Sequence, residues 1–99
     1  MTTMGMGALT IQAWEDGEAG EFQFFVDEGS GLKEFYTKRL ALWEEGSDVG
    51  VMATEAVEAA RGVGVVTDDA TEDAFRELIG KVYGTLHGVQ SGTGDEMLN

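Results

Sequence analysis

The 99-residue sequence contains no cysteine and no proline. Without cysteine the chain cannot form a disulfide, a thiolate nucleophile or a cysteine-ligated metal site. Without proline no turn has a backbone angle fixed by a ring, so we expect the turns to depend on the fifteen glycines. A single small domain is expected over residues 1–99, stabilised by packing and hydrogen bonds alone.

Basic residues are also scarce in this chain. Six lysines and arginines stand against nineteen aspartates and glutamates, so the formal net charge is −13. Such a surface repels nucleic-acid phosphates, and direct DNA or RNA binding is therefore not expected. A salt-rich cytoplasm, a basic protein partner and ordinary solubility all explain the acidity, and the low lysine content favours the first. That explanation predicts a stability that rises with KCl concentration up to molar levels.

Long apolar runs are missing as well. No segment approaches the roughly 18 apolar residues of a membrane-spanning helix, and residues 1–7 lack the basic and apolar regions of a signal peptide. We therefore expect a cytoplasmic protein or a component of a virus particle, with no membrane partner. The 42% hydrophobic content is typical of a globular fold.

Alternating apolar residues predict two strands near the N-terminus, at about 8–14 and 21–26. The polar, glycine-containing segment between them predicts an antiparallel β-hairpin, and residues 1–7 are expected to form an irregular arm. Trp14 and Phe25 lie on the side opposite the main apolar stripe, where they could meet across the hairpin and form a second adhesive face. Glu15, Asp16 and Glu18 in the turn are candidate contacts for a basic partner.

Helical spacing predicts three helices after the hairpin, at about 31–45, 48–61 and 69–88. Ser30 is the expected N-cap of the first helix, and Gly46 is placed to end it. Arg39 falls within the apolar face of this helix. Its stem could pack while its head reaches water, or it could anchor an acidic group of this chain or of a partner.

The middle helix has a thin, alanine-rich apolar face that would let another helix approach closely. A short strand over 49–52 is the alternative for its first turn, because Gly50 weakens a helix start. Residues 62–67 form either a buried linker or a third strand, with the strand at 63–67. Residues 89–99 are expected to form a polar tail.

The last predicted helix has two different faces. Its apolar residues cover one side, whereas Gly80, Gly84 and Gly88 form a row on the opposite side. Each interior glycine costs about 1 kcal/mol relative to alanine, so the row is either a second contact face for a helix or subunit, or a weakly stable exposed helix end.

Groups that carry chemistry are few. His87 is the only histidine, and no serine lies in a nucleophile-elbow pattern. The acidic cluster Asp68, Asp69, Glu72 and Asp73 could hold a cation, but acidic side chains at a helix start are also favoured by the helix dipole. We predict no catalytic, cofactor-binding or metal-binding residue.

These features together predict an α+β fold and a non-catalytic protein–protein interaction or assembly subunit. A minor structural protein of a virus particle or other large complex from a salt-adapted host would be an example. The alternative is an acidic inhibitor in the basic groove of a nucleic-acid-handling complex, and an enzyme with a carboxylate-only site is the least favoured. The expected partners are other protein subunits of the same or a different chain. The candidate interaction residues are Gly80, Gly84, Gly88, Arg39, Trp14, Phe25, Glu15, Asp16 and Glu18.

Overall fold

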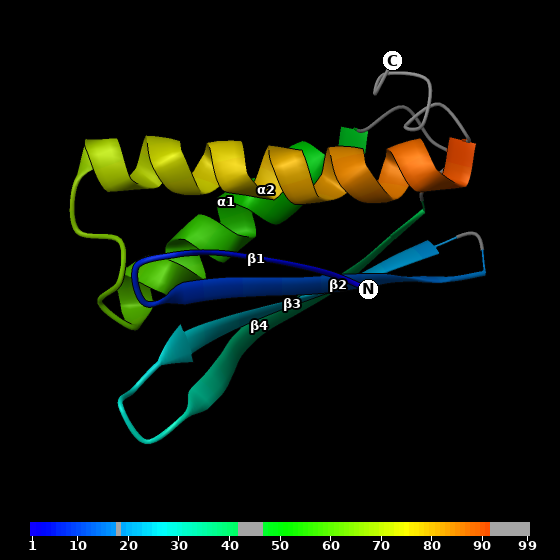
Figure 1. Ribbon diagram of the computed structural model, residues 1–99. Coiled ribbons are helices and arrows are strands. Elements are labelled where there is room, and N and C mark those ends of the chain that lie inside the picture. Colours follow the sequence, from blue (N-terminus) through cyan, green and yellow to red (C-terminus); the bar gives the residue numbers. More distant parts are fainter. Residues whose placement is uncertain (18, 42–46, 92–99) are drawn as a thin grey trace, which may run out of the picture.

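The computed structural model describes residues 1–17, 19–41 and 47–91, with the backbone alone at 47–48 and 87–91. The chain forms a four-stranded antiparallel sheet followed by two helices, which is an α+β fold (Figure 1). The strands are neighbours in chain order, so the sheet is a meander. The elements are β1 (Thr2–Met6), β2 (Leu9–Asp16), β3 (Ala19–Asp27), β4 (Leu32–Ala41), α1 (Ser47–Gly62) and α2 (Asp69–Ser91).

The predicted hairpin is confirmed as β2 and β3, and both strands are longer than predicted. Ile11 lies opposite Phe24 in its register, so the apolar residues of the two strands share one face. Gly7 supplies the positive φ of 55° in the tight connection from β1 to β2.

The predicted irregular arm at residues 1–7 is wrong, because residues 2–6 form β1. Met4 lies opposite Ile11 and Met6 opposite Leu9, so both methionines extend the apolar face of the hairpin. Gly5 lies at a close approach between the two strands, since a Cβ added there would be 2.9 Å from the Leu9 carbonyl oxygen. Residues 2–6 therefore form a strand because they pair with β2, although their own sequence shows no strand pattern.

The predicted helix at 31–45 is also wrong. Residues 32–41 form β4, and 42–45 lie outside the described residues together with its expected end at Gly46. The expected cap, Ser30, lies in the β3–β4 turn. A bulge explains the error: Phe24 pairs with Tyr36 but Phe25 pairs with Glu34, so Phe35 is an extra residue. The bulge shifts the strand alternation by one, and the apolar positions then imitate helical spacing.

The other two predicted helices are confirmed as α1 and α2. A strand at 49–52 and a strand at 63–67 are both wrong, since the first segment is helical and the second is a loop. Asp68 caps α2, because its Oδ1 accepts a hydrogen bond from the Thr71 N–H at 2.7 Å. Residues 89–91 of the expected tail belong to α2, and 92–99 lie outside the described residues.

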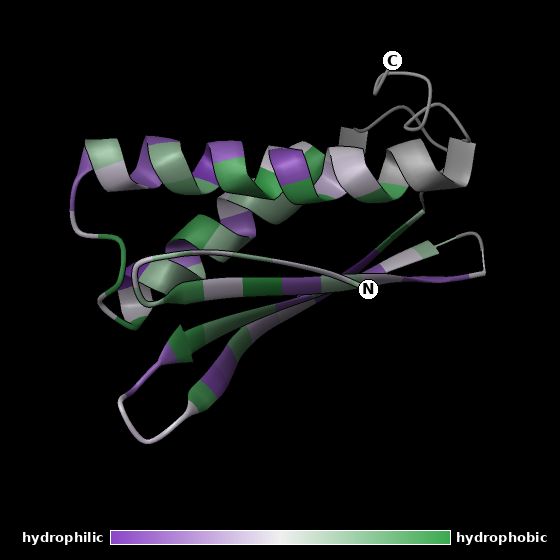
Figure 2. Ribbon diagram, in the orientation of Figure 1, coloured by the Kyte–Doolittle hydropathy of each residue, from purple (hydrophilic) through white to green (hydrophobic). Residues whose placement is uncertain are grey.

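The core lies between one face of the sheet and the two helices. α2 packs over β1 and β2, α1 packs against β4, and the helices contact each other (Figure 1). Hydrophobic and hydrophilic residues alternate along the strands, as expected for a sheet with one covered face (Figure 2). The Phe24 ring lies 5.4 Å from that of Tyr36 and 6.0 Å from that of Phe75, the latter edge to face. Within the described part of the chain, neither helix is long and apolar enough to cross a membrane.

Candidate interaction surfaces

The second face of the sheet has no cover among residues 1–17, 19–41 and 47–91, because both helices pack on the opposite face (Figure 1). The register places one row of side chains across all four strands on this open face. The row consists of Thr3, Gln12, Gln23 and Thr37. The neighbouring rows contain Thr10 beside Phe25, and Trp14 beside Glu21 and Arg39. We call these residues the open sheet face.

The open sheet face confirms one expectation about Trp14 and Phe25 and corrects another. Both half-buried side chains lie on this face, opposite the core, as the alternation predicted. They do not face each other across the hairpin, because Trp14 pairs with Glu21 and Phe25 with Thr10. Four residues along a strand separate the two positions by about 13 Å.

Arg39 lies on the open sheet face and not on a helix. Its Nη1 is 2.7 Å from Asp16 Oδ2 and 3.5 Å from Glu21 Oε2. The guanidinium therefore binds acidic groups of its own chain, on the two strands that precede β4. Of the acidic turn residues, Glu15 is exposed, whereas Glu18 lies outside the described residues.

Gly80 and Gly84 of the glycine row lie on the solvent side of α2, as their angular position predicted. Gly80 and Gly84 are exposed, and a Cβ added at either position would meet no atom within 4 Å. Gly88 lies in the part of α2 where only the backbone is described. Packing within this chain does not require glycine at Gly80 or Gly84, and the predicted contact role of the row stays a prediction.

The open space around Gly84 gives a direct stability prediction. Gly84→Ala is expected to raise the free energy of unfolding by about 1 kcal/mol, because alanine restricts the unfolded chain and fits the helix without a clash. Urea denaturation measures the change. Gly64→Ala is the control, since Gly64 has a φ of 80° and alanine there should destabilise the fold. A loss of stability in Gly84→Ala would show that another group packs on this face.

The acidic cluster at the start of α2 has structural partners. Asp68 caps the helix, and Glu72 accepts hydrogen bonds from Arg61 of α1 and from Arg76 Nε, the latter at 3.1 Å. The hydrogen bond from Arg61 and that from Arg76 lower the pKa of Glu72. No group of three histidines, aspartates or glutamates arranged for a metal ion occurs in the described part of the chain. These contacts support the interpretation of the acidic cluster as a stabilised start of α2.

The lowered pKa of Glu72 predicts an acid-dependent loss of stability. A carboxyl group with a depressed folded-state pKa stabilises the fold above its unfolded value of 4.5, and this contribution disappears as the pH falls through the folded value. Glu72→Gln should therefore lower the thermal midpoint at pH 7, with a difference from wild type that shrinks below pH 4.5. Glu77→Gln is the matched control, because the Glu77–Lys81 pair is exposed and should contribute little. A pH-independent difference for Glu72→Gln would contradict the prediction.

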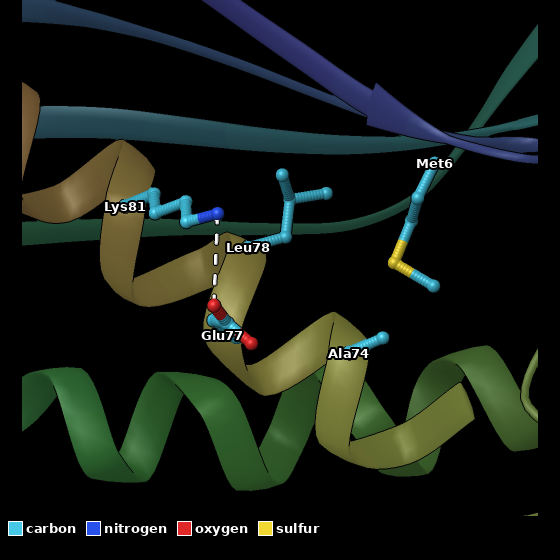
Figure 3. A pocket seen from close by; sticks show the side chains of 5 residues that line it. All are labelled: Met6, Ala74, Glu77, Leu78 and Lys81. Carbon is cyan, nitrogen blue, oxygen red and sulfur yellow. Dashed lines mark ion pairs between the residues drawn. The ribbon is translucent and has the colours of Figure 1, made fainter. Parts of the chain in front are cut away.

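Shallow hollows lie beside both helices in the described part of the chain. One, of about 250 Å³, lies between β1 and α2 and is lined by Met6, Ala74, Glu77, Leu78 and Lys81 (Figure 3). Its charged groups are engaged with each other, since Lys81 Nζ lies 3.6 Å from Glu77 Oε1. The other, of about 490 Å³, is lined by Gly50, Val51, Thr54 and Glu55 on the surface of α1. His87 lies in the part of α2 where only the backbone is described.

A polar cluster that the sequence did not suggest joins β4 to α1. The Tyr36 hydroxyl donates a hydrogen bond to Glu55 Oε1, and Lys38 Nζ lies 3.5 Å from the same oxygen. Burial and the bond to Glu55 raise the pKa of Tyr36, and the bond from Tyr36 lowers the pKa of Glu55. The cluster holds the middle of α1 against the sheet. Only the pairing of β4 brings these residues together.

Comparison of the chain with models of protein families, with curated proteins and with solved structures gives no significant match. No residue role is therefore carried over from a relative. The open sheet face has an uncharged central row in a strongly acidic chain, and its residues Thr10, Gln12, Gln23 and Thr37 were not named as candidates from the sequence. Three of them, Thr10, Gln12 and Gln23, lie in the predicted hairpin. There the sequence did contain a signal, because these uncharged residues alternate with the core residues.

Proposed function

We propose that this protein is a non-catalytic interaction subunit that binds another protein through the open sheet face. The uncharged centre of that face carries the proposal. Charged residues make up 25% of the chain, yet the row from Thr3 to Thr37 contains only threonine and glutamine, with Phe25 and Trp14 beside it. Loss of charge and enrichment in aromatic residues are typical of the centre of a protein interface.

The rim of the open sheet face indicates the chemistry of the partner. Asp16, Glu21, Asp27 and Glu34 surround the centre, and Arg39 is already paired with the first two. A partner with a flat uncharged centre and basic residues around it would complement this rim. Two copies of this chain would instead bring two acidic rims together, so we propose a different protein for this face.

We propose further that the complex is a virus particle or another large assembly from a salt-adapted source, and that this protein is one of its structural subunits. Particle and complex fractions of that source are therefore the starting material for its test. Native mass measurement of the protein purified with its bound partners would show whether a complex of defined stoichiometry exists.

Charge substitutions test whether such a complex forms through the open sheet face. Gln12→Glu with Gln23→Glu places two charges at its half-buried centre and should abolish the complex without unfolding the protein. Thr67→Glu with Ala70→Glu adds the same charge at exposed positions near the start of α2 and should leave the complex intact. A protein that carries no partner, or a complex that survives the Gln12 and Gln23 changes, would overturn the proposal.

The acidic-inhibitor alternative uses a different surface, and exposed Glu15 at the β2–β3 turn is the observation that favours it. Replacement of Glu15, Asp16 and Glu18 by their amides should abolish binding of a basic groove in that case. Under the open-face proposal the same change should mainly slow association, because Asp16 lies at the rim and not at the centre of that face. The two sets of variants therefore separate the two functions.

A further inference from the structure

The outer edge of β4 offers backbone groups for another strand. β4 is the last strand in the sheet order, and this ten-residue strand pairs with β3 alone among the described strands. The Asp27 N–H bonds the Ala8 carbonyl at 2.8 Å, which makes 27 and 8 a hydrogen-bonded pair. Because such pairs alternate, Tyr36, Lys38 and Leu40 bond β3, and Thr37, Arg39 and Ala41 direct their N–H and C=O groups outward.

The devices that protect a strand edge are weak in the regular part of β4, because its Lys38 and Arg39 are paired with acidic groups of the same chain. The chain has no proline, and the bulge at Phe35 leaves the strand regular from Tyr36 to Ala41. At the opposite edge of the sheet β1 has only five residues, so it offers a shorter template. The regular part of β4 is therefore the better template for strand addition.

Charge permits a second copy of this chain as the occupant, because Lys38, which lies opposite itself in a symmetric pairing, is neutralised by Glu55 of its own chain. β4 holds Lys33, Lys38 and Arg39 but only one acidic residue, and it is the one described element with a net positive charge. Lys38 lies beside Glu55, and Arg39 lies beside Asp16 and Glu21. The edge is thus close to neutral, whereas the rest of the chain is strongly acidic. Two copies can meet here without opposing unpaired carboxylates.

An exposed apolar side chain lies beside the same edge. Val51 of α1 is 48% exposed, and it is one of the four large hydrophobic residues exposed in the described part of the chain. Val51 lies one helical turn before Glu55, which bonds Tyr36 and Lys38 of β4. Together with Gly50 and Thr54 it lines the hollow of about 490 Å³, which a second α1 helix would cover.

We propose that two copies of this chain join by antiparallel pairing of their β4 strands about a two-fold axis at Lys38. Thr37 would then exchange backbone hydrogen bonds with Arg39 of the second copy, and Tyr36 would lie opposite Leu40 of that copy. The result is a continuous eight-stranded sheet with the two α1 helices side by side. This dimer leaves both open sheet faces free, so it does not depend on the function proposed above.

A cysteine substitution tests this geometry directly, because the chain has no cysteine of its own. The axis makes the two Lys38 residues a non-hydrogen-bonded pair with Cα atoms about 4.5 Å apart, which suits a disulfide. Lys38→Cys should therefore form a disulfide-linked dimer on mild oxidation, detected by mass measurement. Thr3→Cys, at the opposite edge of the sheet, is the control and should stay a free thiol. A free thiol in Lys38→Cys would overturn the proposed axis.

The oligomeric state of the protein without a cross-link completes the test. Wild type should be a dimer in native mass measurement, and Val51→Glu should weaken the dimer about tenfold or more by placing a carboxylate at the junction of the α1 helices. Val63→Glu is the matched control, because Val63 is 45% exposed and lies in the α1–α2 loop. A monomeric wild type, or equal effects of the two glutamates, would overturn the dimer. The Gln12→Glu and Gln23→Glu changes should leave it intact, which separates this test from that of the open sheet face.

Discussion

Phe24→Ala is expected to lower the free energy of unfolding by about 3–5 kcal/mol, enough to unfold much of a small domain. Phe24 is fully buried, and its ring contacts those of Phe35, Tyr36 and Phe75. Alanine would leave a cavity where β3, β4 and α2 meet, and none of the three aromatic neighbours could fill it without leaving its own contacts. Urea denaturation followed by circular dichroism measures the loss.

Phe25→Ala is the control for this prediction. Phe25 is the next residue in β3 and carries the same side chain, but it lies half-buried on the open sheet face. Its removal should cost about 1 kcal/mol or less, since it leaves no enclosed cavity. Equal losses for Phe24→Ala and Phe25→Ala would mean that the open sheet face is covered in the folded protein.

Ala56→Leu is expected to destabilise the protein by about 1–3 kcal/mol through overpacking. Ala56 and Ala60 are fully buried on α1, where their small side chains let the helix lie close to its neighbours. Three additional carbon atoms at Ala56 would push α1 away from the core and strain the Tyr36–Glu55 hydrogen bond that ties this helix to β4. Thermal or urea unfolding detects the change.

The exposed residue Ala70 gives the matched substitution for Ala56. Ala70→Leu should leave the free energy of unfolding within about 0.5 kcal/mol of wild type, because surface positions tolerate such changes. If Ala56→Leu were equally mild, α1 would pack more loosely on the core than its buried alanines indicate.

The parts of the fold that sequence reasoning predicted correctly have a strong local pattern. β2 and β3 alternate strictly over their core positions, so their period of two identifies both strands and the face that each buries. α1 and α2 have apolar residues at helical spacing, and a capping aspartate marks the start of α2. Gly80 and Gly84 were placed correctly on the exposed side of α2 because a regular helix fixes every residue's angle.

The errors concern strands whose order depends on a neighbour. β4 has an extra residue at Phe35, and this bulge produces apolar spacing that matches a helix as well as a strand. Its aromatic and β-branched residues, Phe35 to Thr37, were the one local indication of a strand. β1 is too short to show a clear period, and it is ordered by its hydrogen bonds to β2.

The candidate surfaces were predicted only where a local pattern decides the position of a residue. Trp14 and Phe25 were assigned to the correct face, because alternation decides the face of a strand. The neighbours of Arg39 were not predicted, since its ion pairs with Asp16 and Glu21 follow from the pairing of β4 with β3. The free β4 edge could not be seen at all while those residues were assigned to a helix.

The sequence by itself determined the acidity, the absence of thiol chemistry, the period of most elements and the side on which their apolar residues lie. These properties depend on composition or on residues a few positions apart, where backbone geometry alone sets the spacing. Only the tertiary structure decided the strand order, the bulged register of β4, the face left open and the partners of Arg39 and Tyr36. Each of these depends on hydrogen bonds and packing between distant segments, which local patterns do not encode.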